Sequence, residues 1–166
     1  MTSLPFPFPV VTWDEGAVVL IDQTLLPGRV EFRRCGDIPS LCRAIVELAV
    51  RGAPAIGVTA AYGCYLAGGE VQAAGGEGDW KDQLSEKLDQ IENARPTAVN
   101  LRWAVEEMQA AREKQGVDEH DQRMGRGPEP FQINPIIPET IAHLGQRYSD
   151  QNRIGAEFGR LEQRVA

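Results

Sequence analysis

The sequence predicts an α+β fold, in which a small antiparallel β-sheet at the N-terminus is followed by a helical bundle. Two observations predict it. Up to Cys35 the chain consists of short β-rich runs separated by turn residues, and beyond Asp37 the apolar residues recur every three or four positions. We expect one compact domain, with a β-meander over residues 1–36 and a helical region over residues 37–166.

The predicted strands cover residues 10–13, 17–22 and 30–35. The run Asp14-Glu15-Gly16 has the composition of a hairpin turn between the first two, and Pro27-Gly28 marks a turn before the third. Short connections of this kind favour antiparallel neighbours.

The first helix is predicted to begin after Asp37, which can cap it, with Pro39 in the first turn. One apolar stripe follows, made of Leu41, Ala44, Ile45, Leu48 and Ala49. The triplet Arg51-Gly52-Ala53 ends this helix.

The second helix is predicted from Pro54 to about Ala67, where Gly68-Gly69 ends it. It is apolar almost all round, so we expect it to be buried on most sides.

Two further amphipathic helices are expected. The third is indicated by Leu84, Leu88 and Ile91, and Arg95-Pro96 interrupts it. Thr97 is predicted to cap the fourth, whose apolar face contains Leu101, Val105 and Met108, then Ala111 or Arg112. Residues 116–138 are polar and rich in Gly and Pro, so we expect little order there, followed by a last helix from Pro138.

Composition excludes several classes of function. The chain has 17 Lys+Arg against 24 Asp+Glu, and a net charge of −7 argues against nucleic acid or an anionic membrane as partner. We expect a cytoplasmic protein without metal or cofactor, because the cysteines form no Cys-x-x-Cys pair and neither a secretory signal nor a membrane-spanning run is present. These cysteines are Cys35, Cys42 and Cys64.

Two predicted helix starts share a design that suits a phosphate. Arg51 precedes Gly52-Ala53 at one start, and Arg95 precedes Pro96 at the other. A helix N-terminus carries unpaired N–H groups and partial positive charge, and a guanidinium beside it completes an anion site. If the two starts converge, they would hold one small phosphorylated molecule. The alternative is that both motifs are only a turn and a linker between helices.

The run from Val50 to Val58, Val50-Arg51-Gly52-Ala53-Pro54-Ala55-Ile56-Gly57-Val58, resembles the characteristic motif of methylthioribose-1-phosphate isomerases. Three further pieces are similar to that family in the same order: Ile21-Asp22-Gln23-Thr24-Leu25-Leu26-Pro27, Ala94-Arg95-Pro96-Thr97-Ala98, and Asn152-Arg153-Ile154-Gly155. The resemblance covers nearly the whole chain except residues 116–138.

The resemblance implies an aldose–ketose isomerase of methionine salvage, which interconverts methylthioribose 1-phosphate and methylthioribulose 1-phosphate. It implies that Arg51, Gly52, Ala53 and Arg95 contact the sugar phosphate, and that the full-length protein is a homodimer. The family's relatives include ribose-1,5-bisphosphate isomerases and regulatory subunits of the translation-initiation exchange factor, and the latter generally lack the Arg-Gly-Ala-Pro motif.

The resemblance also implies what these residues do not contain. The family's catalytic cysteine lies in a Thr-x-Cys-Asn stretch and its catalytic aspartate in a Rossmann-like C-terminal domain, and this sequence has neither. We therefore expect no catalytic residue and no activity from these 166 residues alone. Cys64 and Cys42 are interpreted as small core residues, and Cys35 closes a strand without a catalytic role. His120 and His143 have no partner by spacing, and Asp22 is expected to anchor a turn.

Two other functions stay open. One is a non-catalytic module that binds a sugar phosphate or a protein partner, and the other is an isomerase of a different sugar 1-phosphate, such as ribose 1,5-bisphosphate.

Overall fold

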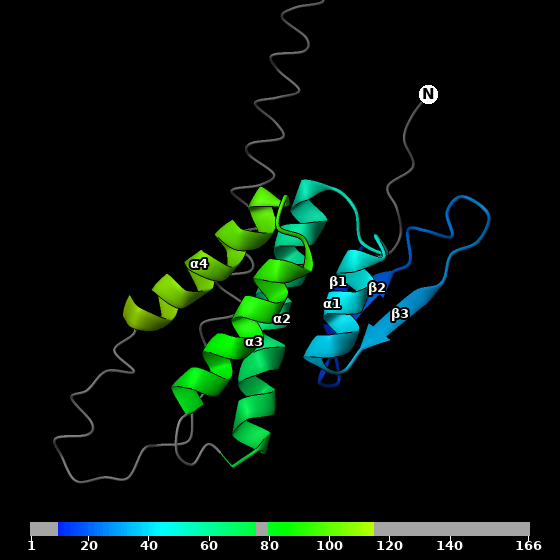
Figure 1. Cartoon of the computed structure of the whole chain (residues 1–166). Helices are drawn as coiled ribbons and strands as arrows, with labels where there is room; N and C mark the ends of the chain where they lie inside the picture. Colours follow the sequence, from blue (N-terminus) through cyan, green and yellow to red (C-terminus); the bar gives the residue numbers. More distant parts are fainter. Residues whose placement is uncertain (1–9, 76–79, 115–166) are drawn as a thin grey trace, which may run out of the picture.

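A computed structural model describes residues 10–75 and 80–114. Within these residues the chain forms three strands and then four helices, which confirms the predicted α+β fold (Figure 1). The expectations for residues 116–138 and for a helix from Pro138 lie outside the described residues. The division at residue 36 between meander and helical region stays a prediction.

The sheet is formed by β1 (Val11–Asp14), β2 (Ala17–Ile21) and β3 (Phe32–Cys35), antiparallel and in the order β1-β2-β3. Asp14 pairs with Ala17, so Glu15 and Gly16 form a two-residue turn, with φ of 41° and 78°. Positive φ at both central residues is the hairpin turn whose twist suits neighbouring antiparallel strands. The two predicted turns thus lie where the sequence indicates them.

Helix α1 (Ile38–Val46) begins as predicted. The Asp37 carboxylate accepts a hydrogen bond from the Ser40 N–H at 2.7 Å, and the Ser40 hydroxyl accepts from the Asp37 N–H in return. The helix buries one stripe of side chains against the sheet and α3: Ile38, Leu41, Ala44 and Ile45.

The prediction that Leu48 belongs to this stripe is wrong. The helix ends at Val46, and Leu48 has a φ of 60° and is 37% exposed. The Ala49 N–H donates to the Ala44 carbonyl and the Leu48 N–H to the Ile45 carbonyl, which is the hydrogen-bond pattern of a Schellman C-cap. The left-handed backbone that closes this cap turns the Leu48 side chain out of the core.

Helix α2 (Ala53–Ala73) lies in the middle of the packing and contacts α1, α3, α4 and the first two strands. The predicted end at Gly68-Gly69 is wrong, because the helix continues to Ala73. Each helical glycine costs roughly 1 kcal/mol, but Val71 beyond the pair is only 2% exposed. Burial of that side chain in the core offsets the cost of continuing the helix.

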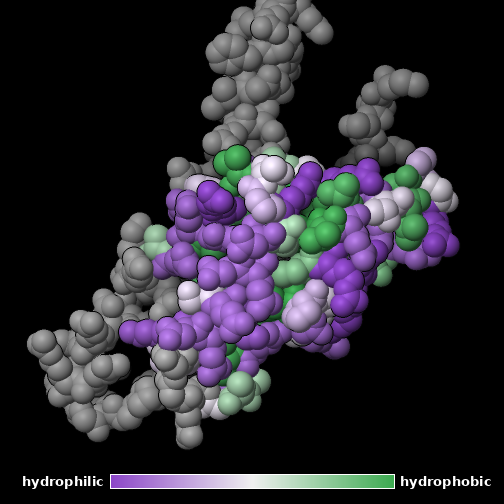
Figure 2. Space-filling model, in the orientation of Figure 1, coloured by the Kyte–Doolittle hydropathy of each residue, from purple (hydrophilic) through white to green (hydrophobic). Residues whose placement is uncertain are grey.

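Helix α3 (Trp80–Ala94) returns alongside α2 and buries Leu84, Leu88 and Ile91, as predicted. Its opposite face, turned to the viewer in Figure 2, is hydrophilic, as expected of an amphipathic helix. Because α3 runs antiparallel to α2, α4 (Val99–Lys114) starts at the end of the bundle where α2 also starts (Figure 1).

Thr97 does not precede α4 directly, contrary to the prediction. The Ala98 N–H donates to the Arg95 carbonyl at 2.9 Å, so residues 95–98 form a turn and α4 begins one residue later, at Val99. None of the helices in the described part of the chain is both long and apolar enough to cross a membrane.

Candidate functional site

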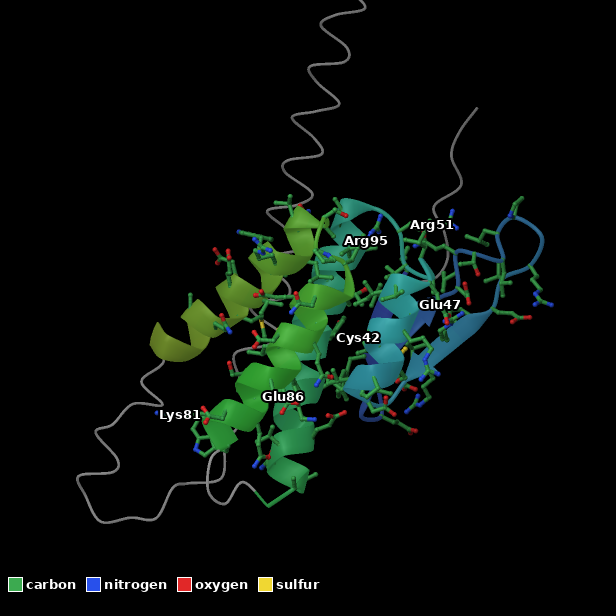
Figure 3. The ribbon with its side chains drawn as sticks, viewed as in Figure 1. Cys42, Glu47, Arg51, Lys81, Glu86 and Arg95 are labelled. Carbon is green, nitrogen blue, oxygen red and sulfur yellow. The ribbon has the colours of Figure 1, made fainter. Side chains whose placement is uncertain are left out.

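A cleft of about 510 Å³ opens at the end of the bundle where α2 and α4 begin. Its walls come from the α1–α2 connection, the first turn of α2, the α3–α4 connection and the first residues of α4: Leu48, Arg51, Gly52, Ala53, Ile56, Arg95, Thr97, Ala98, Val99 and Asn100. All four predicted site residues are among them. Figure 3 shows Arg51 and Arg95 at this end of the molecule, on the two connections.

The start of α2 leaves backbone donors without helical partners. The first helical bond runs from the Ile56 N–H to the Gly52 carbonyl, and no side chain caps the helix. The N–H groups of Ala53 and Ala55 come before that bond, and Pro54 has none. Gly52 has a φ of 88°, a conformation that residues with a Cβ rarely adopt, so this entry into the helix requires glycine.

The start of α4 lies against the start of α2. A Cβ added at Gly57 would lie 3.5 Å from the Asn100 carbonyl oxygen, so the two helices approach closely one turn into α2. Each N-terminus carries roughly half a unit of positive charge, and at this separation both act on the same cleft. Gly57 permits this proximity, because a large side chain there would push Asn100 away.

Arg51 is held by Leu48 on the α1–α2 connection and by Gln23 on the turn after β2. Its Nε donates to the Leu48 carbonyl oxygen at 3.2 Å, and its own carbonyl accepts from the Gln23 side-chain amide at 3.4 Å. The bond to Leu48 occupies Nε and leaves the terminal guanidinium nitrogens available for a ligand.

The described walls of the cleft carry no negatively charged side chain. Among the described residues, neither Arg51 nor Arg95 forms an ion pair, and no Asp or Glu lines the walls. By contrast, the arginines in and beside β3 are each paired with a carboxylate: Arg29, Arg33 and Arg34. Two guanidinium groups without an ion pair make the cleft locally positive, although the chain as a whole carries a net charge of −7.

Among the residues that the structure describes, the cleft walls offer no general acid or base for neutral pH, because no His, Cys, Asp or Glu lines them. Burial raises the pKa of Cys64 to about 12, and it also raises the pKa values of Cys35 and Cys42. Cys42 and Cys64 pack against the hydrophobic core, as predicted, and Cys35 lies in it. His120 and His143 lie outside the described residues.

No group of three His, Cys, Asp or Glu side chains that would suit a metal ion occurs within residues 10–75 and 80–114. The polar groups that the cleft presents are arginine side chains and the backbone N–H groups at the start of α2.

Asp22 anchors the turn after β2, as predicted. Its Oδ1 accepts from the Thr24 N–H at 3.0 Å and from the Thr24 hydroxyl, and its Oδ2 accepts from the Arg33 Nε at 3.1 Å. The residue is 4% exposed. Arg33 also forms an ion pair with Glu47, so it links this turn to the end of α1.

No sequence pattern assigned the remaining polar and apolar wall residues to a binding site. Thr97 and Asn100 follow Arg95 closely in the chain, so their position beside an arginine was a usable signal. Leu48 gave no signal, because its spacing fits the apolar stripe of α1 and its unusual φ is visible only in the structure.

A family model matches most of the residues that line this cleft. The model of the Initiation factor 2 subunit family matches residues 49–148, more than half of the chain. The chain belongs to this family. The matched region of the family domain includes both arginines and both helix starts that form the cleft.

Curated family members similar to the chain include isomerases. A methylthioribose-1-phosphate isomerase of Maridesulfovibrio salexigens is 59% identical over 95 residues, which cover 57% of this chain and 27% of the relative. A putative methylthioribose-1-phosphate isomerase of Aeropyrum pernix is 37% identical over 153 residues, covering 92% of this chain and 38% of the relative. The chain thus spans well under half the length of these relatives.

Two solved family structures share the fold. The 5-methylthioribose 1-phosphate isomerase of Pyrococcus horikoshii OT3 matches with a TM-score of 0.55 and 27% identity over 84% of this chain and 35% of its own. The delta subunit of translation initiation factor eIF-2B from A. fulgidus matches with a TM-score of 0.62 and 30% identity over 83% of this chain and 36% of its own.

Proposed function

We propose that this chain is the N-terminal part of a methylthioribose-1-phosphate isomerase, and that its cleft binds the phosphate of the sugar substrate. The observation that carries the proposal is the meeting of two ion-pair-free arginines and two helix N-termini in one cleft without a carboxylate. The similarity to isomerases at up to 59% identity supports the choice of substrate.

In the proposed reaction this part of the protein positions the substrate. An aldose–ketose isomerisation moves hydrogen between adjacent carbons, which needs a proton-transferring group and donors that stabilise charge on oxygen. Arg51 and Arg95 would fix the phosphate, so that the sugar carbons take up one orientation. No base lines the cleft among the described residues. From the family resemblance, we propose that the proton-transferring groups come from residues outside this chain.

The other expectations are proposals as well. We propose a cytoplasmic location, a homodimer in the full-length protein and an isomerisation that uses neither metal nor organic cofactor. The Rossmann-like domain expected from the resemblance would supply the rest of the active site.

The phosphate site is tested by calorimetric titration of the 166-residue chain with methylthioribose 1-phosphate. Replacing Arg51 or Arg95 by Gln should weaken binding about ten- to a hundredfold, because each removes a charge-assisted hydrogen bond. Arg34→Gln is the matched control, since it removes an arginine paired with Asp14 away from the cleft, and it should leave the affinity unchanged. Equal affinity in all three variants would refute the site.

Substrate identity and activity need separate measurements. Ribose 1,5-bisphosphate in the same titration tests the alternative isomerase, and tighter binding of that compound would favour it. An isomerase assay on the 166 residues alone should show no turnover. Measurable turnover would contradict the proposal that the proton-transferring groups lie elsewhere.

A second candidate function is supported by the match to the translation initiation factor subunit, which has a TM-score of 0.62. In that case the chain would be a non-catalytic interaction module. Failure to bind any sugar phosphate, together with a native fold by circular dichroism, would favour this candidate over the first.

A further inference from the structure

The α1–α2 connection that carries Arg51 is fixed from outside by the turn after β2. The Gln23 N–H donates to the Ala49 carbonyl at 2.8 Å, and the Gln23 side-chain amide donates to the Arg51 carbonyl. Residues 22–24 and 47–51 are therefore tied together, although more than twenty residues separate them in the chain.

An ion-pair relay adds a second tie at the other end of the same connection. Arg33 donates through Nε and Nη2 to the Asp22 carboxylate and through Nη1 to Glu47, the C-cap residue of α1. Asp22 is nearly buried, and its other oxygen is held by Thr24. The relay therefore starts from a carboxylate that cannot move without breaking several hydrogen bonds.

Between these ties the backbone takes an unusual conformation that sets the direction of Arg51. Leu48, with its φ of 60°, is a bulky residue in the left-handed region, which costs on the order of 1 kcal/mol or more. This conformation presents the Leu48 carbonyl oxygen to the Arg51 Nε at 3.2 Å. The strained residue thus holds the arginine side chain at the wall of the cleft.

We propose that Arg33 is a positioning residue for the phosphate cleft: by linking buried Asp22 to Glu47, it fixes the connection that directs the Arg51 guanidinium. Arg33 is not among the residues that line the cleft. The positioning itself follows from the geometry alone, while its effect on a ligand rests on the proposed function.

The test uses Glu47→Ala, which removes the outer end of the relay and leaves the ion pair between buried Asp22 and half-buried Arg33 intact. The matched control is Asp14→Ala, because Asp14 is also an exposed carboxylate paired with an arginine of β3 but contacts no part of the connection. Arg33→Lys serves as a second variant, since one ammonium cannot bridge both carboxylates as the guanidinium does.

The first readout needs no ligand. In the ¹H–¹⁵N spectrum, the Arg51 Nε–H signal is assigned by its loss in Arg51→Lys, and its exchange with water is measured. We expect exchange to be at least roughly threefold faster in Glu47→Ala and Arg33→Lys. It should be unchanged in Asp14→Ala, because the exposed Asp14–Arg34 ion pair is weak and does not touch the connection. Unchanged exchange in both relay variants would overturn the positioning role.

The second readout is the dissociation constant for methylthioribose 1-phosphate, with inorganic phosphate as the minimal probe. We expect it to rise roughly threefold or more in the relay variants, while the urea midpoint of Glu47→Ala stays close to that of Asp14→Ala. If Arg51 exchange is faster in the relay variants but the unaltered chain binds neither probe, the positioning role is upheld and the proposed phosphate function is overturned.

Discussion

At the scale of single residues, Asp22 is a buried carboxylate that accepts hydrogen bonds from Thr24 and Arg33. The hydrogen bond from the Thr24 hydroxyl, then the Thr24 N–H and Arg33, hold the pKa of Asp22 below its usual value, although burial opposes them. A carboxylate with a lowered pKa stabilises the fold above about pH 4, and that stabilisation is lost as the pH falls through the lowered pKa.

The variant Asp22→Asn tests this role. We expect it to lower the free energy of unfolding by about 2–4 kcal/mol at pH 7, because it leaves the half-buried Arg33 without its inner partner. The measurement is urea unfolding at several pH values between 7 and 3. The difference in free energy of unfolding between Asp22→Asn and the unaltered chain should shrink toward pH 3. A difference that stays constant with pH would count against a stabilising role of the Asp22 carboxylate.

The cysteines give a second prediction at this scale. With a pKa of about 12, the Cys64 thiol is almost wholly protonated at pH 8. Its alkylation by iodoacetamide in the native chain should therefore be roughly a thousandfold slower than that of an unhindered thiol. Peptide mapping after timed alkylation measures the rate, and urea should restore normal reactivity. Rapid labelling of Cys64 in the native state would contradict the raised pKa of its thiol.

At the scale of elements, two glycines inside α2 have opposite surroundings. A Cβ at Gly63 would lie 2.8 Å from Leu41 Cδ2 and 3.1 Å from Ile91 Cδ1, whereas a Cβ at Gly69 would meet nothing within 4 Å. Gly63 therefore lets α1 and α3 pack tightly on α2, and Gly69 has no such role.

Alanine at the two positions should change stability in opposite directions. We expect Gly63→Ala to destabilise the fold by about 1–2 kcal/mol through overpacking, even after the gain in helix propensity. Gly69→Ala should stabilise it by about 0.5–1 kcal/mol, because only the propensity changes. Thermal and urea unfolding compare the two variants directly, and a Gly63→Ala chain as stable as Gly69→Ala would show that the core around Leu41 is loose.

The same elements show what sequence patterns can and cannot predict. The stripe of Leu84, Leu88 and Ile91 placed α3 correctly, because burial of one helix face is a local periodic signal. The predicted end of α2 is wrong because Gly68-Gly69 disfavours a helix only by intrinsic propensity. Burial of Val71 in the core stabilises the helix beyond that pair. Leu48 fits an apolar period, yet a C-cap places it outside the core.

The site was predictable only in its parts. Arg51 and Arg95 were identified from chemistry near helix starts, but 44 positions separate them in the numbering. Their convergence depends on the antiparallel return of α3 and on the close approach at Gly57, which are both tertiary features. Asp22 was predicted as a turn anchor, while its link through Arg33 to the Arg51 connection needed coordinates.

At the scale of the whole molecule, a ligand that joins two connections should stabilise the entire bundle. At methylthioribose 1-phosphate concentrations about a hundredfold above its dissociation constant, we expect the free energy of unfolding to rise by roughly 2.7 kcal/mol. Urea midpoints with and without ligand measure the gain. Arg95→Gln at the same ligand concentration should show a much smaller increase, and an equal increase would place the ligand elsewhere.

The antiparallel return of α3 has a consequence for insertions and deletions. One residue of helix corresponds to a rotation of about 100° and a rise of about 1.5 Å. A single-residue insertion between Ile91 and Arg95 would therefore swing the second guanidinium away from the first while the buried stripe stayed in place. The number of residues between Ile91 and Arg95, more than their composition, determines whether the two arginines can contact the same anion.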